Sequence, residues 1–337
     1  MSRRERITLA LCVLAFVLLA FLPQVTSAYL LTLAISIAMY TVLATSWALF
    51  SGPTRYISLA TGAFYGMGAY IVASGIGVLP YAVLVLLAAI AGGLLAFLVG
   101  VATLRLSGVY FVIFTLGLAE FIRQVVTWVQ NNFSGSRGLY VLTDIKSQHI
   151  YWELLVLAAL VLWVGWLVRR SRLGFALRII GDDEVVAAHS GIHAPAAKVT
   201  LFVISGIFAA LVGAVMAPRF TYIEPAMVFS PELSFQVVIM ALLGGVHRLW
   251  GPLVGVVPFT LLWEAISASF PTQTVLLLGL AFLLIVYFIP HGVVGLLEKL
   301  SQRRLNRPGH AGYSGAAGAA GTAGAAGRPG TAKADHA

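Results

Sequence analysis

Charged residues are scarce in this chain: they make up 10% of its 337 residues, while 60% are hydrophobic and the mean hydropathy is +0.96. Soluble domains carry roughly 25% charged residues, so a water-soluble fold could not cover this much apolar surface. The sequence also lacks the segments of about 10 alternating apolar and polar residues that build a membrane β-barrel. Its apolar runs are continuous over about 20 residues. We therefore predict an all-α polytopic integral membrane protein.

Residues for metal, redox or nucleotide chemistry are also scarce. Cys12 is the only cysteine, which excludes a disulfide framework and a cysteine-based metal site. No phosphate-binding loop of the Gly-x-x-x-x-Gly-Lys-Ser/Thr type occurs, no His/Glu helical motif suggests zinc, and no Ser/His/Asp set stands out. We expect no metal, no cofactor and no catalytic residue on this chain. If transport is driven by ATP and Mg²⁺, both bind to partner subunits.

About ten apolar runs are candidates for crossing a bilayer. They cover residues 7–22, 29–50, 57–77, 81–104, 108–130, 151–168, 199–218, 233–246, 252–270 and 273–294. The first run follows a basic start and could alternatively be a cleaved signal peptide. Because the next apolar run begins almost at once, we count it as a helix.

The positive charge lies next to these spans, which argues for a membrane lipid environment and against nucleic acid as a partner. With the amino terminus inside, 17 of the 21 Lys and Arg residues fall in the cytoplasm, three fall outside and Arg123 lies within a span. The internal loops alone divide eight to three. This asymmetry follows the positive-inside rule and predicts that both termini of a multi-pass membrane protein are cytoplasmic.

The long polar interruption, residues 169–198, separates the sixth and seventh spans. It begins with basic residues and carries the acidic cluster Asp182, Asp183 and Glu184. Gly181 can break a helix, and Asp182 can cap the next one through its carboxylate. We predict two short cytoplasmic helices at the membrane face, joined near Gly181.

Ionisable residues inside the spans are candidates for the translocation path. Glu120 and Arg123 are three residues apart, so they share one face of a helix. A charge at membrane depth costs at least about 2.5–3.5 kcal/mol on insertion scales, which favours a functional role. The alternative is a self-neutralising pair that holds neighbouring helices together. Glu264 has the same two interpretations.

Three glycines, Gly62, Gly66 and Gly68, fall within seven residues around Tyr65. Small residues allow close helix packing, but they also weaken a helix and could leave an unwound or re-entrant segment. Exposed backbone groups of such segments bind substrates in several transporters. Both interpretations stay open. We divide the chain into a permease domain at 1–304, which contains the polar element 169–198, and an Ala/Gly-rich tail at 305–337 that we expect to be disordered.

Four stretches, in order, resemble the LivM-type permease subunit of branched-chain amino-acid ABC importers. They are residues 57–70 (ISLATGAFYGMGAY), 104–116 (LRLSGVYFVIFTL, running on to Glu120 and Arg123), 173–192 (LGFALRIIGDDEVVAAHSGI) and 243–255 (LGGVHRLWGPLVG). The resemblance implies a non-enzymatic membrane subunit that imports leucine, isoleucine, valine or related small amides. It also implies a homologous LivH-type permease, two cytosolic ATP-binding subunits and an extracytoplasmic substrate-binding protein as partners.

The same resemblance implies that residues 178–191 form the coupling element that docks on the ATPase. The residues assigned to it are Arg178, Gly181, Asp182, Asp183, Glu184, Ala187, Ala188 and Gly191. Two departures put the substrate in doubt: Ala60 or Thr61 stands where the family has a polar residue of the His or Gln kind, and Arg137 lies in a Gly-Ser-Arg-Gly run where the family has Asn or Thr. Related permeases carry urea, short amides or aromatic acids.

Two other functions compete with this interpretation. An ion-coupled secondary transporter would use Glu120 or Glu264 as a titratable acid and would need no ATPase. An integral-membrane enzyme would need a polar constellation at one membrane face, and the sequence shows none.

Overall fold

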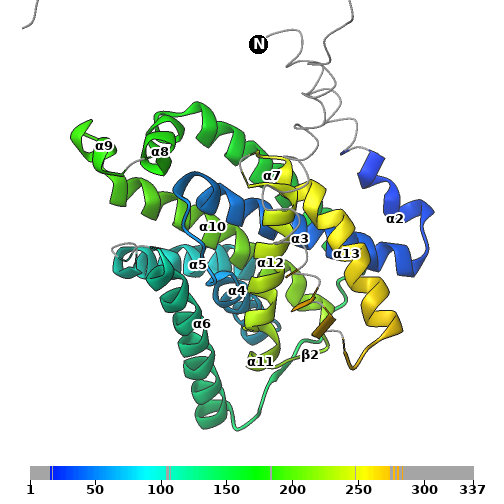
Figure 1. Cartoon of the computed structure of the whole chain (residues 1–337). Coiled ribbons are helices and arrows are strands. Elements are labelled where there is room, and N and C mark those ends of the chain that lie inside the picture. Colours follow the sequence, from blue (N-terminus) through cyan, green and yellow to red (C-terminus); the bar gives the residue numbers. More distant parts are fainter. Residues whose placement is uncertain are drawn as a thin grey trace, which may run out of the picture.

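The computed structural model describes residue 16 and residues 18–283, with gaps at 104–105, 107, 183, 247, 274–275, 278 and 281–282. Most of the predicted first and last spans and all of the tail at 305–337 lie outside the described residues. Within them the chain forms a bundle of helices (Figure 1). Seven of the described helices are long and apolar enough to cross a membrane. The predicted all-α polytopic fold is confirmed.

The described elements follow one another in a simple order. The helices are α2 (Leu22–Val25), α3 (Ala28–Thr54), α4 (Thr61–Gly75), α5 (Tyr81–Thr103), α6 (Val109–Val129, continued by the π-helical turn Gln130–Ser134), α7 (Ser147–Arg170), α8 (Arg172–Asp182), α9 (Glu184–His189), α10 (Ala194–Met216, continued by the 3₁₀ turn Ala217–Arg219), α11 (Pro225–Val228), α12 (Pro231–Gly244) and α13 (Gly251–Ser269). The strands β1 (Leu139–Tyr140) and β2 (Tyr222–Ile223) pair antiparallel and join two outer loops.

Helix α4 differs from the span predicted at 57–77. It has 15 residues and begins only at Thr61. At 1.5 Å per residue its length is about 22 Å, which is shorter than the hydrocarbon core of about 30 Å. The six residues before it, 55–60, are not helical. The chain therefore crosses this part of the membrane partly as a helix and partly as non-helical backbone.

Helix α10 lies at the centre of the bundle and packs on α3, α4 and α5. Small residues bring the backbones together: a Cβ built on Gly213 would lie 1.9 Å from the carbonyl oxygen of Tyr65, and one on Gly68 would lie 1.9 Å from that of Ala210. Small residues serve this purpose between membrane helices because lipid tails give no hydrophobic drive for association. Tight packing of α4 on α10 therefore holds the short helix in place.

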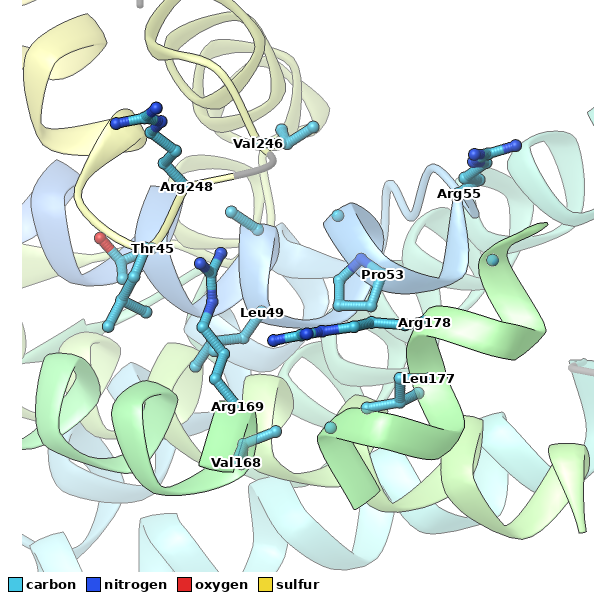
Figure 2. Close-up of a pocket in the computed structure, with 15 residues that line it drawn as sticks. Thr45, Leu49, Pro53, Arg55, Val168, Arg169, Leu177, Arg178, Val246 and Arg248 are labelled. Carbon is cyan, nitrogen blue, oxygen red and sulfur yellow. The ribbon is translucent and has the colours of Figure 1, made fainter. Parts of the chain in front are cut away.

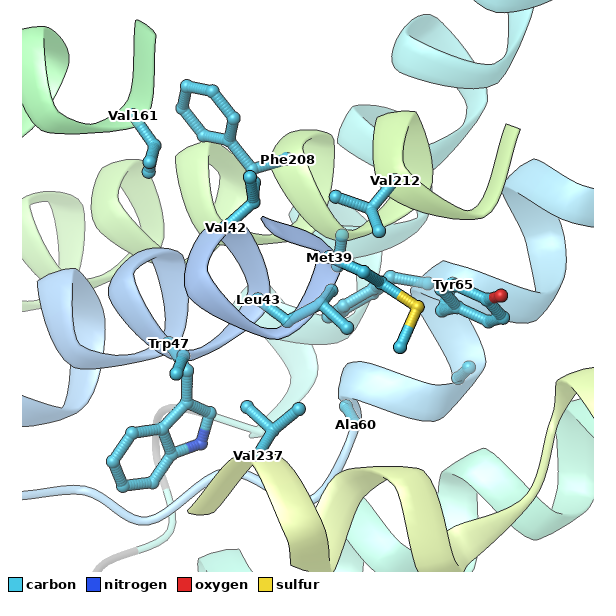
Figure 3. Packing of buried hydrophobic residues seen from close by; sticks show 14 of the residues in the cluster. Met39, Val42, Leu43, Trp47, Ala60, Tyr65, Val161, Phe208, Val212 and Val237 are labelled. Atoms are coloured by element: carbon cyan, nitrogen blue, oxygen red, sulfur yellow. The ribbon is translucent and has the colours of Figure 1, made fainter. Parts of the chain in front are cut away.

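The buried side chains around α3 fill the rest of the core (Figure 3). Met39, Leu43 and Trp47 of α3 point toward α4, α10 and α12, where Val212 and Val237 meet them. A set of edge-to-face aromatic rings lies nearer the end of α3. The ring centroid of Phe202 lies 5.0 Å from that of Phe50 and 5.5 Å from that of Phe64. This packing joins the helices that surround the candidate site.

Candidate functional site

Two backbone groups of the non-helical segment 55–60 form hydrogen bonds with neighbouring helices. The Trp47 indole Nε1 donates to the Ser58 carbonyl at 2.8 Å, and the Leu59 amide donates to the Thr115 hydroxyl at 3.1 Å. Ser58, Leu59 and Ala60 are buried. Non-helical backbone at membrane depth is tolerated only where protein covers it or where it lines a cavity. Helices α3 and α6 therefore hold this segment in place.

The beginnings of two helices meet beside this segment. The Gly62 amide, in the first turn of α4, donates to the Ser234 hydroxyl in the first turn of α12 at 2.8 Å. A Cβ on Gly62 would lie 2.8 Å from the Ser230 carbonyl oxygen, so the contact needs glycine. Ser230 followed by Pro231 is a typical helix start, since the serine side chain caps and proline suits the first position. The amino-terminal ends of both helices carry partial positive charge.

From Gly62, α4 runs for about 20 Å, and from Ser234, α12 runs for about 15 Å. The charge pattern predicts that α4 leads toward the outer face and α12 toward the cytoplasm, which would put the junction near the middle of the membrane. The sum of the two lengths is close to the thickness of the hydrocarbon core. Discontinuous helices that begin at the bilayer midplane are how several transporters place positive helix ends against a substrate.

A group of polar side chains, which we call the central polar cluster, comes from α3, α4, the turn after α10 and the first turns of α12: Tyr40, Tyr65, Arg219, Glu232 and Gln236. The Tyr40 hydroxyl donates to the Gln236 side-chain oxygen, and the Gln236 amide donates to Glu232 at 3.2 Å. Tyr65 is buried and lies in the neighbourhood of Tyr40 and Arg219. The Nη1 atom of Arg219 is buried and has no hydrogen-bond partner among the described residues. The cluster thus combines donors and acceptors at membrane depth.

The glycines of α4 settle one of the questions left open by the sequence. Gly62, Gly66 and Gly68 are all helical, so they are not themselves an unwound segment. A Cβ on Gly66 would lie 2.5 Å from the Phe229 ring, and Gly68 packs on α10. Close packing explains Gly66 and Gly68, whereas the interruption of the helix lies just before them, at 55–60. Gly62 belongs to the junction with α12.

Glu120 and Arg123 form an ion pair on α6. The Arg123 Nε donates to Glu120 Oε2 at 2.8 Å, a second guanidinium nitrogen contacts Oε1, and the Gln124 amide also donates to Oε1, at 2.9 Å. The side chains are 27% (Arg123) and 39% (Glu120) exposed. The predicted pairing on one helix face is confirmed. The structure does not bring this pair together with the glycines of α4, and Glu264 lies half-buried near the end of α13.

Two helices, α8 and α9, occupy the polar interruption between α7 and α10, as the sequence predicts. The joint was predicted near Gly181; α8 ends at Asp182 and α9 begins at Glu184, so Gly181 itself lies in the last turn of α8. Gly181 has a packing role, because a Cβ there would lie 2.3 Å from the carbonyl oxygen of Pro53 in α3. Asp182 is helical rather than a cap for α9.

The end of α9 explains two further residues of the interruption. The Ile192 amide donates to the Ala187 carbonyl at 3.1 Å, and Gly191 has φ +74°, which is the left-handed turn that commonly ends a helix. Ala187 is fully buried. Arg178 is exposed on α8. Asp183 lies outside the described residues, and the side chains of Asp182, Glu184 and Ala188 are not described.

Comparison with known proteins identifies the family. Residues 29–288 match the model of the branched-chain amino acid transport system / permease component. The chain belongs to this family. This permease is a multi-pass protein of the bacterial inner membrane.

Two kinds of curated relative are similar to this permease. It is 27% identical, over 282 residues, to the high-affinity branched-chain amino acid transport system permease protein LivM of Escherichia coli K12 and of Salmonella typhimurium LT2. That match covers 72% of this chain and 64% of LivM. It is also 27% identical to the autoinducer 2 import system permease protein LsrC of Escherichia coli SMS-3-5, over 74% of both chains. No solved structure matches the permease.

Sequence reasoning missed most of the central polar cluster of this permease. Tyr40, Arg219, Glu232 and Gln236 each occur singly in or beside an apolar run, and they meet only through the fold. One signal was available: Glu232 and Gln236 are four residues apart and share a helix face.

Proposed function

We propose that this chain is the membrane-spanning permease subunit of an ATP-driven ABC importer. In this proposal it pairs with a homologous, LivH-type permease, two cytosolic ATP-binding subunits supply ATP and Mg²⁺, and an extracytoplasmic binding protein delivers the substrate. The family match supports the transport role. The similarity to both LivM and LsrC leaves the substrate to be argued from the chemistry of the site.

The observation that carries the proposal is the contact between α8 and the broken segment. Gly181 lies against Pro53, two residues before Arg55, whose φ of 59° begins the non-helical stretch. That stretch leads directly to Gly62 and the junction with α12. An ATPase docked on the α8–α9 pair could displace α8. Residues 55–60 would then transmit this displacement to the junction of α4 and α12. A packed element of this kind transmits motion as a rigid body.

Helix α6 is the proposed contact with the partner permease. Only 17% of an 18-residue apolar stretch of this helix is buried within this chain, although the helix carries the Glu120–Arg123 pair. A half-exposed ion pair facing lipid is costly, and such residues normally face another helix or a water-filled path. A second permease packed on α6 would cover the pair and place it beside the translocation path.

The substrate that we propose is a branched-chain amino acid: leucine, isoleucine or valine. The amino-terminal ends of α4 and α12 suit a carboxylate, and Glu232 with Tyr40 and Gln236 suits an ammonium group. The carboxylate and the ammonium group of a zwitterion suit these two parts of the site. An uncharged sugar or urea suits both parts less well. We expect Glu232→Gln to lower leucine uptake by about tenfold, because a hydrogen bond to a charged group contributes about 1.5–3 kcal/mol. Equal uptake by Glu232→Gln and wild type would remove this residue from the substrate site.

The first experiment is a pull-down of the chain from native membranes, with ATP hydrolysis assayed in the presence and absence of candidate binding proteins. Stoichiometric ATPase subunits and stimulated hydrolysis are expected, and the ligand of the effective binding protein names the substrate. Elution of this chain alone, with uptake that collapses under an uncoupler, would favour an ion-coupled secondary transporter instead.

Gly181→Ala tests the contact that carries the proposal. The added Cβ would force α8 away from Pro53, and overpacking of this kind costs about 1–3 kcal/mol. We expect ATP-driven uptake to fall by about tenfold, while membrane insertion and co-purification of the ATPase persist. Gly279→Ala is the control, since no described residue lies within 4 Å of its added Cβ. Wild-type uptake by Gly181→Ala would exclude this route of coupling.

A further inference from the structure

A hollow of about 410 Å³ opens beside α8 at the cytoplasmic end of the bundle (Figure 2). Its walls come from the last turns of α3, the end of α7, α8, and the turn between α12 and α13. Four of its 15 lining residues are arginines: Arg55, Arg169, Arg178 and Arg248. None of these described lining residues is acidic. The hollow, which we call the arginine pocket, is therefore lined by four guanidinium groups.

The arginines are arranged at two levels in the pocket. Arg169 from α7 and Arg178 from α8 extend into the hollow beside Leu49, whereas Arg55 and Arg248 stand at its rim (Figure 2). The guanidinium group stays protonated in proteins, so this charge persists whatever other side chains the arginines contact. A guanidinium fork binds two oxygens of a phosphate at once. The arrangement thus suits a phosphate placed between α7 and α8.

The walls of the arginine pocket are apolar. Leu49, Leu177 and Leu249 line it together with valines from α7 and from the turn before α13. A free inorganic anion would leave these walls in contact with water. A ligand with a phosphate at one end and hydrocarbon at the other matches both parts of the pocket.

Tryptophan–arginine pairs flank the pocket on two helices. Arg170 lies 4.5 Å from the Trp166 ring centroid at the end of α7, and Arg248 lies 5.5 Å from that of Trp250 at the start of α13. The two tryptophans are 40% and 50% exposed. Exposed tryptophan at helix ends marks the level of the lipid headgroups. The pocket therefore opens at the depth where phospholipid phosphates lie.

We propose that the arginine pocket binds the headgroup of an anionic phospholipid of the cytoplasmic leaflet. Arg169 and Arg178 contact the phosphate, the rim arginines attract it, and the leucines contact the glycerol and upper acyl chain. Basic pockets between helices on the cytoplasmic side recognise lipid headgroups through this combination of charge and apolar surface. The inference does not depend on which solute the chain transports.

The test measures lipid bound to the purified full-length chain by native mass spectrometry. The probes are phosphatidylglycerol, phosphatidylcholine with the same acyl chains, and inorganic phosphate. We expect phosphatidylglycerol to be retained over phosphatidylcholine and not to be displaced by millimolar phosphate. Arg169→Gln with Arg178→Gln should weaken its binding by about thirtyfold, because each interfacial cation contributes about 1 kcal/mol.

The matched control is Arg172→Gln, which removes an exposed charge from α8 outside the pocket and should leave binding unchanged. If the double variant elutes as an aggregate, the rim pair Arg55→Gln with Arg248→Gln carries the test instead. Equal retention of the two lipids, or equal binding by the pocket variant and the control, overturns the proposal. Displacement by inorganic phosphate would make this a free-anion site, and release of lipid when ATPase subunits bind would make it a protein-docking site.

Discussion

Helices α10 and α6 are similar in length and both apolar, but they lie in opposite surroundings. The spanning segment of α10 has 26 residues and that of α6 has 25, yet 61% of the apolar window is buried in the first and 17% in the second. Figure 1 shows α10 within the bundle and α6 along its edge. Hydropathy therefore identifies which segments enter the membrane but not what they face there.

Side-chain size separates the two helices where hydropathy does not. Gly206, Gly213 and the alanines between them are buried on α10, and their backbones touch neighbouring helices. On α6 large residues such as Phe121 and Trp128 are more than half exposed. Since packing of membrane helices depends on close backbone approach, the small residues mark the centre of the bundle. The large ones mark a surface left for lipid or for another subunit.

The same substitution in the two helices should give opposite results, and this is the largest effect that we expect. Gly213→Ala would place a Cβ 1.9 Å from the Tyr65 carbonyl oxygen, so α4 and α10 must separate. We expect a loss of about 3 kcal/mol or more in folding free energy. Gly117→Ala on α6 meets no described residue within 4 Å and should stabilise the chain by up to about 1 kcal/mol through helix propensity.

Thermal unfolding of the two variants in the same detergent checks the pair. A lowered midpoint for Gly213→Ala and an unchanged or raised one for Gly117→Ala are expected. Equal destabilisation by both variants would mean that α6 packs as tightly as α10 in solution, which contradicts the comparison.

The positions of the spans could be predicted from the sequence because a hydrocarbon core of fixed thickness demands long apolar runs. The length of α4 could not. Residues 55–60 are as apolar as their surroundings, and what holds them in a non-helical path is contact with Trp47 of α3 and Thr115 of α6. Hydropathy averaged over a window does not distinguish a helix from non-helical backbone whose hydrogen bonds are made to neighbouring helices.

The candidate site was predictable only where its residues were close in sequence. The Glu120–Arg123 pair follows from helix geometry alone. The hydrogen bond between Gly62 and Ser234 joins residues 172 positions apart, and local patterns carry no information about it. Gly181 shows the converse: glycine suggested a helix break, but the fold uses it for contact with Pro53. The tertiary contact, rather than local propensity, decides its role.

The smallest effect that we expect concerns the ion pair on the open helix. Glu120→Gln leaves Arg123 without its carboxylate, whereas Glu120→Gln with Arg123→Gln removes both charges. In the isolated chain Arg123 would then lie without its counter-charge on a helix face exposed to detergent, so the single variant should lose more folding free energy than the double variant, in which neither charge remains. The assembled transporter should respond more strongly, since a partner packed on α6 would bury the uncompensated arginine. Thermal unfolding of the chain alone and of the complex separates these cases. An equal effect in both would show that α6 faces lipid and not the second permease.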